Sequence, residues 1–179
     1  DDGLNWYVYH KAAGHTNYLT LDRDHGAIAN NFLNNTAPTN SVITLNNTAE
    51  VNANSQDIIC YAWTSVAAYS SFGSYTGNGS ADGPYVALPF APKWIMFKRT
   101  DATNNWFILD TARNPFNALT DYLSADISNA EATSANIADA LSNGFKVRGG
   151  STYYGFNASG GTYIYIAFAE HPFKTARAR

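Results

Sequence analysis

The sequence predicts an all-β protein, an antiparallel β-sandwich or jelly roll, and three observations lead to this prediction. Short runs of strand-forming residues recur along the 179 residues, separated by Asn-, Gly- and Pro-rich connections, and helical periodicity is nearly absent. Aromatic residues make up 15% of the chain, whereas only 14% of it is charged. Aromatic and β-branched residues favour strands, while Gly, Pro and Asn favour the turns between them.

The pattern predicts nine strands, at residues 5–10, 18–21, 41–45, 57–66, 84–90, 93–100, 105–110, 144–149 and 162–173. In the run Trp94 to Lys98 nearly every position is apolar, which indicates a strand covered on both faces. The run 162–170 alternates poorly and is also expected to lie deep. Segment 129–143 is interpreted either as a helix, since Ile137 and Leu141 are four apart, or as a long loop with a single turn.

A repeated pattern divides the chain into two parts. Three anchors recur in the same order, at offsets of 100, 104 and 105: Asn5 to Tyr9 with Asn105 to Leu109, Tyr18 to Thr20 with Tyr122 to Ser124, and Cys60 to Trp63 with Tyr165 to Phe168. Asn52-Ala53 and Asn157-Ala158 also match at offset 105. Residues 1–69 are therefore predicted to be the back part of a first repeat, and residues 70–179 a complete second repeat.

A sandwich half without its front strands would expose unpaired strand edges and an uncovered apolar face. Three solutions are open: an upstream part of the chain supplies the strands, a neighbouring subunit supplies them, or both repeats merge into one sandwich. The first residue is Asp rather than Met, so the N-terminus was removed or the chain is a piece of a longer polypeptide. We expect the third solution, with the two repeats packed as one β-sandwich domain, because it needs nothing outside the chain.

The overall composition excludes several classes of function. A net charge of -3 gives no general attraction to nucleic acid or to an anionic membrane surface. No apolar run approaches the length of a membrane span. The single cysteine, Cys60, excludes an internal disulfide, and its apolar neighbours predict that it is buried.

Candidate metal-binding and catalytic groups are weak. Asp22, Asp24 and His25 could form a metal cluster with His15, but their run is typical of a strand leading into a polar turn. Asp82 could bind calcium, although its Gly-rich surroundings are typical of a turn. No carboxylate pair, phosphate loop or nucleophile motif is recognisable. We therefore expect no metal, no cofactor and no enzymatic activity.

Two sets of loop residues are candidates for a role beyond the core. Four aromatic residues in Gly- and Ser-rich stretches are expected to contact a glycan or a partner subunit: Tyr75, Tyr153, Tyr154 and Phe156. Asp110 and Arg113 are expected to form a structural pair that fixes the loop after a strand. His10, which takes the place of Asp110 in the first repeat, is expected to be a surface or turn histidine.

Several motifs occur together in the second part of the chain: Phe90 to Thr100, Trp106, Asp110 with Arg113, Asn143 to Phe145, and Asn157 to Tyr163. In this combination they resemble a module of structural proteins from tailed bacteriophages, common in phages of marine and other aquatic bacteria. Nearly the whole chain takes part in the resemblance. One departure, Leu88-Pro89 where the module usually has a glycine before Phe90, concerns a local turn.

The resemblance implies a concanavalin A-like β-sandwich in a virion protein and supplies no catalytic residues. The expected function is that of a tail-fibre or spike component, displayed on the phage particle surface, which builds the fibre and binds a host-surface glycan. The alternatives are a capsid-surface decoration protein and a polysaccharide-degrading enzyme domain. Expected partners are further copies of the chain (fibres are commonly trimers), other virion proteins and host-surface polysaccharide, without nucleic acid or membrane insertion.

Overall fold

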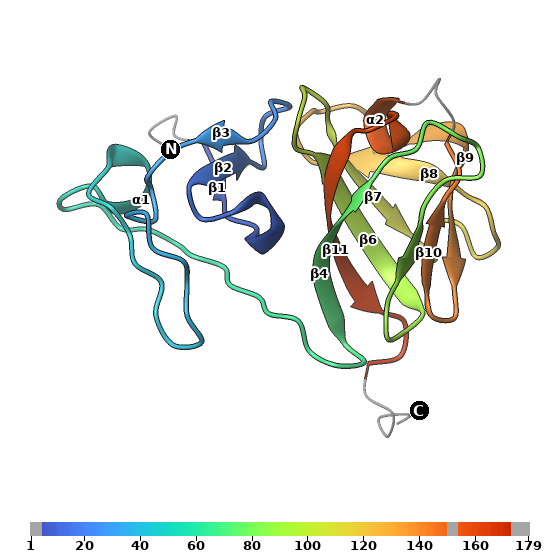
Figure 1. Cartoon of the computed structure of the whole chain (residues 1–179), viewed down its shortest axis with the longest axis horizontal. Helices are drawn as coiled ribbons and strands as arrows, with labels where there is room; N and C mark the ends of the chain where they lie inside the picture. Colours follow the sequence, from blue (N-terminus) through green and yellow to red (C-terminus); the bar gives the residue numbers. More distant parts are fainter. Residues whose placement is uncertain (1–4, 150–153, 173–179) are drawn as a thin grey trace.

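The computed structural model describes residues 5–149 and 154–172, and the strand pairs that it forms are antiparallel (Figure 1). The strands are β1 (Tyr7–Val8), β2 (Asn17–Thr20), β3 (Ile28–Ala29), β4 (Ser70–Thr76), β5 (Tyr85–Ala87), β6 (Pro92–Arg99), β7 (Trp106–Asp110), β8 (Leu119–Ser124), β9 (Ala132–Leu141), β10 (Gly144–Val147) and β11 (Thr162–Ala169). The helical elements are single turns: η1 (Lys11–Ala13), α1 (Ala49–Asn52) and α2 (Tyr154–Asn157). The prediction of an all-β, antiparallel protein is confirmed.

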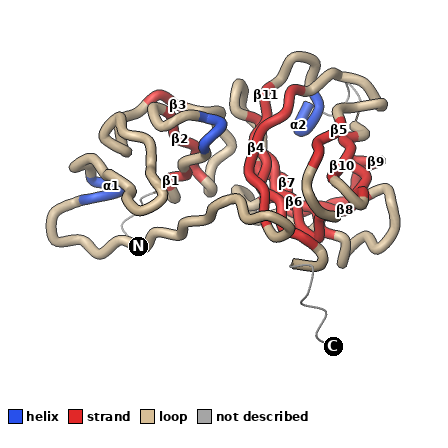
Figure 2. The backbone as a smooth tube through the Cα atoms, turned by 60° about the horizontal axis from the view of Figure 1, so that its bottom comes forward, coloured by secondary structure: helices blue, strands red, loops and turns tan. Residues whose placement is uncertain are grey.

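The larger sheet has eight strands in the order β4-β11-β6-β7-β8-β9-β10-β5, and it curls around a single apolar core (Figures 1 and 2). Ile95 and Phe97 of β6 belong to the same buried cluster as Leu119, Ile137 and Phe145, which come from the other half of the sheet. The two halves therefore bury the same core from opposite sides.

Strand β6 is covered on both faces, as its sequence predicts. Ile95 and Phe97 point into the main core, whereas Met96 belongs to a second cluster on the outer face, with Trp106 of β7 and Ile164 of β11. Strand β11 has the same alternation and is also buried over most of its length. A run that is apolar at every position is stable in a sheet only when both faces are removed from water.

The smaller sheet, β1-β2-β3, lies against this outer face. Leu19 of β2 is fully buried in the second cluster. The indole Nε1 of Trp106 donates to the carbonyl oxygen of Thr20 at 2.8 Å, and the imidazole Nε2 of His10 lies 3.2 Å from the carbonyl oxygen of Tyr165. Side chains and loop contacts join the two sheets, but no strand is shared.

The opposite face of the smaller sheet has a small core of its own. Tyr7 and Tyr18 stack with ring centroids 4.4 Å apart, and they pack with Phe32, Leu33 and Val51 of the following loops and α1. Strands β1–β3 therefore pair only with one another within the described residues, and the two sheets meet through side chains. The packing of both parts as one β-sandwich domain stays a prediction.

Two of the predicted strands do not form, and the reason is the same for both. Residues 41–45 and 57–66 form no strand apart from a single bridge at Val66, because no neighbouring strand lies beside them in the described part of the chain. Figure 2 shows the second run as a long connection that leads to β4. Cys60 in this run is exposed rather than buried.

Segment 129–143 contains β9 and not a helix or loop. A spacing of four is even, so it also places Ile137 and Leu141 on one face of a strand. β9 hydrogen-bonds to β8 on one side and to β10 on the other, and this pairing outweighs the low strand propensity of its alanines.

Replacing Leu19 with Ala should lower the free energy of unfolding by about 2–4 kcal/mol, because it leaves a cavity between the two sheets. Chemical denaturation would measure the change. Leu45→Ala is the matched control, since Leu45 is 37% exposed and its truncation should cost well under half as much. Equal losses for the two variants would contradict the burial of β2 against the larger sheet.

Candidate functional site

An exposed aromatic row is the most prominent surface feature of the described chain. Trp6 stacks on Tyr61 with ring centroids 6.3 Å apart, and Tyr61 stacks on Trp63 at 6.0 Å. The three residues are 53%, 62% and 64% exposed, so their ring faces are open to water. Tyr61 and Trp63 lie two apart in an extended segment, which places them on one side of it.

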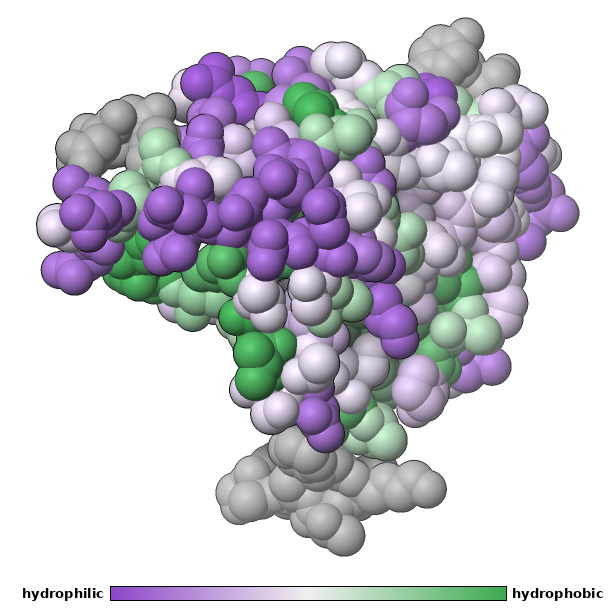
Figure 3. All heavy atoms as spheres, turned by 60° about the vertical axis from the view of Figure 1, so that its left-hand side comes forward, coloured by the Kyte–Doolittle hydropathy of each residue, from purple (hydrophilic) through white to green (hydrophobic). Residues whose placement is uncertain are grey.

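Apolar residues surround the aromatic row in the same extended segment. Ile58 and Ile59 are 45% and 70% exposed, and Cys60 is exposed as well. Figure 3 looks onto the side that holds the smaller sheet, where green apolar groups lie exposed between purple polar ones. Exposed apolar groups do not stabilise the fold of a monomer, and surfaces where many of them lie together usually mark an interaction site.

The structure does not expose two of the four aromatic residues predicted to contact a ligand. Tyr75 is 8% exposed, its ring stacks on Tyr163 at 4.9 Å, and its hydroxyl donates to the carbonyl oxygen of Phe156 at 2.8 Å. Burial raises the pKa of Tyr75 well above its usual value. Phe156 is 2% exposed, packed against Phe97 and Phe107. The prediction of exposed rings is wrong for both residues, because β4 and α2 direct them into the core.

Tyr153, the third predicted residue, lies outside the described residues, and Tyr154 is the first residue of α2. The exposed aromatic row is formed by residues that the sequence did not predict as contacts.

Asp110 and Arg113 lie together in the turn after β7. The Oδ1 atom of Asp110 accepts from the backbone nitrogens of Ala112 at 3.0 Å and Arg113 at 2.8 Å. The guanidinium of Arg113 pairs with the Asp110 carboxylate and donates to Glu131 at 2.5 Å. These hydrogen bonds hold the turn in place, and they also connect Arg113 to Glu131.

His10 lies in the turn after β1, which agrees with one of the two alternatives expected for it, a turn histidine, but it is buried and not at the surface. Its Nδ1 atom accepts from the backbone nitrogen of Ala12 at 3.2 Å and so caps η1. Burial against β11 lowers the pKa of the imidazole. His10 and Asp110 thus cap the turns after β1 and β7 with different side chains.

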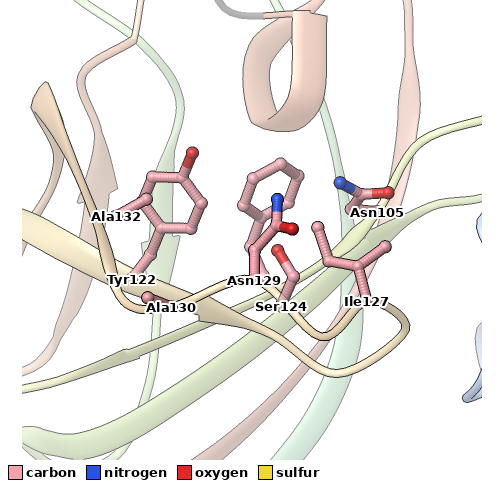
Figure 4. Close-up of a pocket in the computed structure, with 8 residues that line it drawn as sticks. Asn105, Tyr122, Ser124, Ile127, Asn129, Ala130 and Ala132 are labelled. Carbon is pink, nitrogen blue, oxygen red and sulfur yellow. The ribbon is translucent and has the colours of Figure 1, made fainter.

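Two of the pockets among the described residues offer different chemical groups. The first, of about 130 Å³, is lined by Asn105, Phe107, Tyr122, Ser124, Ile127, Asn129, Ala130 and Ala132 (Figure 4). It contains no carboxylate, imidazole or thiol. The asparagine amides and the Ser124 hydroxyl could bind a water molecule or a small polar group, but they supply neither a nucleophile nor a general base.

The second pocket, beside β9 and β10, contains Asp139 and Arg148. Arg148 pairs with Asp139 at 2.5 Å and lies 3.7 Å from Asp82, which also pairs with Lys146 at 2.7 Å. The hydrogen bond from Lys146 lowers the pKa of Asp82. Both carboxylates of this cluster are thus paired with cationic side chains.

The candidate metal residues make ordinary contacts. Asp22 accepts from the backbone nitrogen of Trp6 at 2.9 Å, and His25 bonds to the hydroxyl of Thr20 at 2.9 Å. Within residues 5–149 and 154–172, no three His, Cys, Asp or Glu side chains come together as metal ligands would. The same residues include no helix long and apolar enough to cross a membrane.

A buried lysine joins the two sheets. Lys98 of β6 is fully buried, and its ammonium donates to the carbonyl oxygens of Asp24 at 2.9 Å, Asn104 at 2.6 Å and Arg99 at 3.1 Å. Asp24 belongs to the loop after β2, so one cation links that loop to the larger sheet. The sequence pattern does not predict this role of Lys98, because it cannot show that the loop after β2 covers the lysine.

Burial makes the charged form of Lys98 less favourable than it is in water. Burial lowers the pKa of Lys98 to about 8, although Asp126 and Asp24 favour the charged form. Burial also raises the pKa of Asp126, whose Oδ1 accepts from the backbone nitrogen of Trp106 at 3.0 Å. Such a lysine could serve as a nucleophile elsewhere. Here its protons are directed at three carbonyl oxygens, and it lines neither pocket, so its role is structural.

Comparison with protein families gives one match, over residues 1–172, to a family described as a domain of unknown function, DUF7483. The chain belongs to this family. Comparisons with curated proteins and with solved structures give no match. The DUF7483 match covers both sheets, so the family domain includes the β1–β3 part together with the larger sheet that it packs against.

The stability of the DUF7483 chain should depend on pH through Lys98. Because burial lowers the pKa of the folded lysine to about 8 from 10.5, the unfolded chain binds more protons above pH 8. The free energy of unfolding should therefore rise by about 1 kcal/mol between pH 7 and pH 9, as measured by denaturation at each pH. In Lys98→Met the rise should disappear, together with about 2–4 kcal/mol of stability.

Lys93→Met, at a part-exposed lysine of the same strand, is the control and should keep the rise. A wild-type chain whose stability is flat or falls over this range would show that Lys98 is not held as a buried cation.

Proposed function

We propose that this chain is a non-enzymatic structural protein of a tailed-phage particle, displayed at its surface as a tail-fibre or spike component. The observation that carries the proposal is the exposed row Trp6, Tyr61 and Trp63 beside further exposed apolar groups. Flat aromatic faces of this kind suit the apolar face of a sugar ring or the side chains of a neighbouring subunit. Host-surface glycan and further copies of the chain are accordingly its proposed partners.

The residues that carry the phage resemblance lie at buried or central positions of the fold, as expected of a motif that defines a fold. Pro92–Arg99 forms β6 at the centre of the larger sheet, Trp106 is 1% exposed, and Asn157 is fully buried. Asn157 donates to the carbonyl oxygens of Ser80 at 2.7 Å and Gly149 at 2.5 Å, so it holds three loops together. This supports a resemblance through a shared architecture.

The absence of enzymatic activity is also part of the proposal. Neither pocket of the described chain presents two carboxylates on either side of a cleft, as glycoside hydrolysis would require. Asp82 and Asp139 both face Arg148, and the pKa of Asp82 is lowered. These observations support a binding or building role over a polysaccharide-degrading one.

We further propose that the fold is a concanavalin A-like sandwich module present in two copies, the first lacking its front strands. Strand pairing supports this, because β1-β2-β3 has the same order and register as β7-β8-β9. The corresponding pairs, at offsets of 100 and 104, are Tyr7–Thr20 with Phe107–Ser124, Val8–Leu19 with Ile108–Leu123, Asn17–Ala29 with Asp121–Thr133, and Tyr18–Ile28 with Tyr122–Ala132.

The helical turns and caps agree with the two-module proposal. At offset 105, α1 (Ala49–Asn52) corresponds to α2 (Tyr154–Asn157), and each buries one apolar side chain, Val51 or Phe156. Asp22 accepts from the nitrogen of Trp6 at 2.9 Å as Asp126 accepts from that of Trp106 at 3.0 Å. Unrelated segments would have no reason to share these contacts.

Phage particles that carry the chain with Tyr61→Ser and Trp63→Ser should adhere to host cells at least about tenfold more weakly, because a binding surface usually depends on a few aromatic residues. Phe116→Ser is the control: Phe116 is 83% exposed but outside the row, and adhesion should be unchanged. Adhesion would be counted as bound particles per cell.

Electron microscopy of particles that carry an antibody label on the chain tests the location. Label on fibres or spikes is expected. Label confined to the head facets would contradict the fibre assignment and favour a capsid-decoration role, and unlabelled particles would contradict a virion role altogether.

A further inference from the structure

One edge of the smaller sheet is open where the corresponding edge of the larger sheet is filled. In the larger sheet β7 pairs with β6, and β6 pairs with β11 on its other side. In the smaller sheet β1 is an edge strand, and no described strand pairs with it on the side away from β2. The position that β6 has beside β7 is therefore vacant beside β1.

The unpaired segment, residues 57–64, is the counterpart of β11 at offset 105 and also lacks partners. Within the described chain its backbone makes no backbone–backbone hydrogen bond. Ile58, Cys60 and Ala62 correspond to Tyr163, Tyr165 and Ala167, which are all buried in the main core. The segment thus has the pattern of a core strand but lies in water, because β6 and β4 have no counterparts beside it.

The polar groups around this edge also match. Lys98 of β6 lies close enough to Asp126 for the carboxylate to favour its charged form, and Asp126 binds the nitrogen of Trp106. Asp22 binds the nitrogen of Trp6 in the same way. A strand with a lysine at the position of Lys98 would therefore meet an acidic partner when it pairs with β1.

We propose that the β1 edge and the unpaired segment together form an acceptor site for one β-strand of the Pro92–Arg99 type. The strand comes from a further module of this family that stands directly ahead of the β1–β2 hairpin in the chain. This source is favoured because β6 reaches β7 through the short connection 100–105, so a strand in the same order needs no crossover. The inference rests on the two-module proposal and is independent of the phage assignment.

Strand addition of this kind would bury both parts of the site at once. Backbone hydrogen bonds would form to β1 on one side and to the unpaired segment on the other, as β6 bonds to β7 and β11. The side chains at the positions of Phe97 and Ile95 would lie opposite Cys60 and Ala62, as Phe97 and Ile95 lie opposite Tyr165 and Ala167. Trp6, Tyr61 and Trp63 would stay on the outer face, with the side chains at the positions of Met96 and Lys98 between Trp6 and Tyr61.

Cys60 provides a direct test, because it is the sole cysteine of the chain and its counterpart Tyr165 is 7% exposed. The full chain would be compared with an extended chain in which a second copy of residues 70–104 stands directly ahead of Asn5. The rate at which a thiol reagent labels Cys60 should fall roughly 100-fold or more in the extended chain.

The control extension carries Ile95→Asp and Phe97→Asp in the added copy alone, and labelling should return to the rate of the 179-residue chain. Equal labelling of the unmodified extended chain and the 179-residue chain would overturn the proposal. So would a Cys60 already protected in the 179-residue chain at high concentration, because a second chain would then fill the site.

A second measurement avoids dependence on folding of the extended chain. A peptide of residues 91–101, added to the 179-residue chain, should slow Cys60 labelling in proportion to its concentration, and the doubly substituted peptide should not. No slowing in either format would exclude an acceptor site. The two-module proposal would survive that result, since it falls only if an experimental structure shows different registers for β1-β2-β3 and β7-β8-β9.

Discussion

Strand β6 must be covered on both faces, and most of the structure follows from that requirement. Its inward residues Ile95 and Phe97 need the curled sheet, and its outward residue Met96 needs a second layer. The β1–β2 hairpin supplies this layer through Leu19. Lys98 links the loop behind the hairpin to the larger sheet, because its ammonium donates to the carbonyl oxygen of Asp24 as well as to those of Arg99 and Asn104. Without the first part of the chain, an apolar outer face and a lysine with unpaired donors would both be exposed.

The elements that could be predicted from the sequence are those whose residues determine their own environment. β6, β7 and β11 have dense apolar runs that are stable only in a buried sheet, and each lies within a few residues of its predicted position. β8 and β9 could not be predicted in this way, because LTDYLS and the alanines of β9 have weak strand propensity. Hydrogen-bonded neighbours on both sides decide their conformation, and a local pattern carries no information about neighbours.

The same limit explains the candidate site. Tyr75 and Phe156 have loop-like sequence surroundings, but the strand and helical turn that hold them face the core. The run Ile58 to Trp63 has the sequence of a core strand, yet it is exposed because its partner strands are missing from its surroundings. The pattern there predicts a strand, and none forms because no strand pairs with this run in the described part of the chain. We propose the binding surface at this run for that reason.

The most direct test of this account is amide hydrogen exchange along β6 and the unpaired segment. The account predicts that the amides of Ile95 to Phe97 exchange only on global unfolding, because the strand has neighbours on both edges and cover on both faces. The amides of residues 58–63 should exchange at nearly the rate of an unfolded chain. Fast exchange in β6 would contradict a strand that is covered on both faces. Strong protection of residues 58–63 in the chain alone would contradict the vacant strand position beside β1.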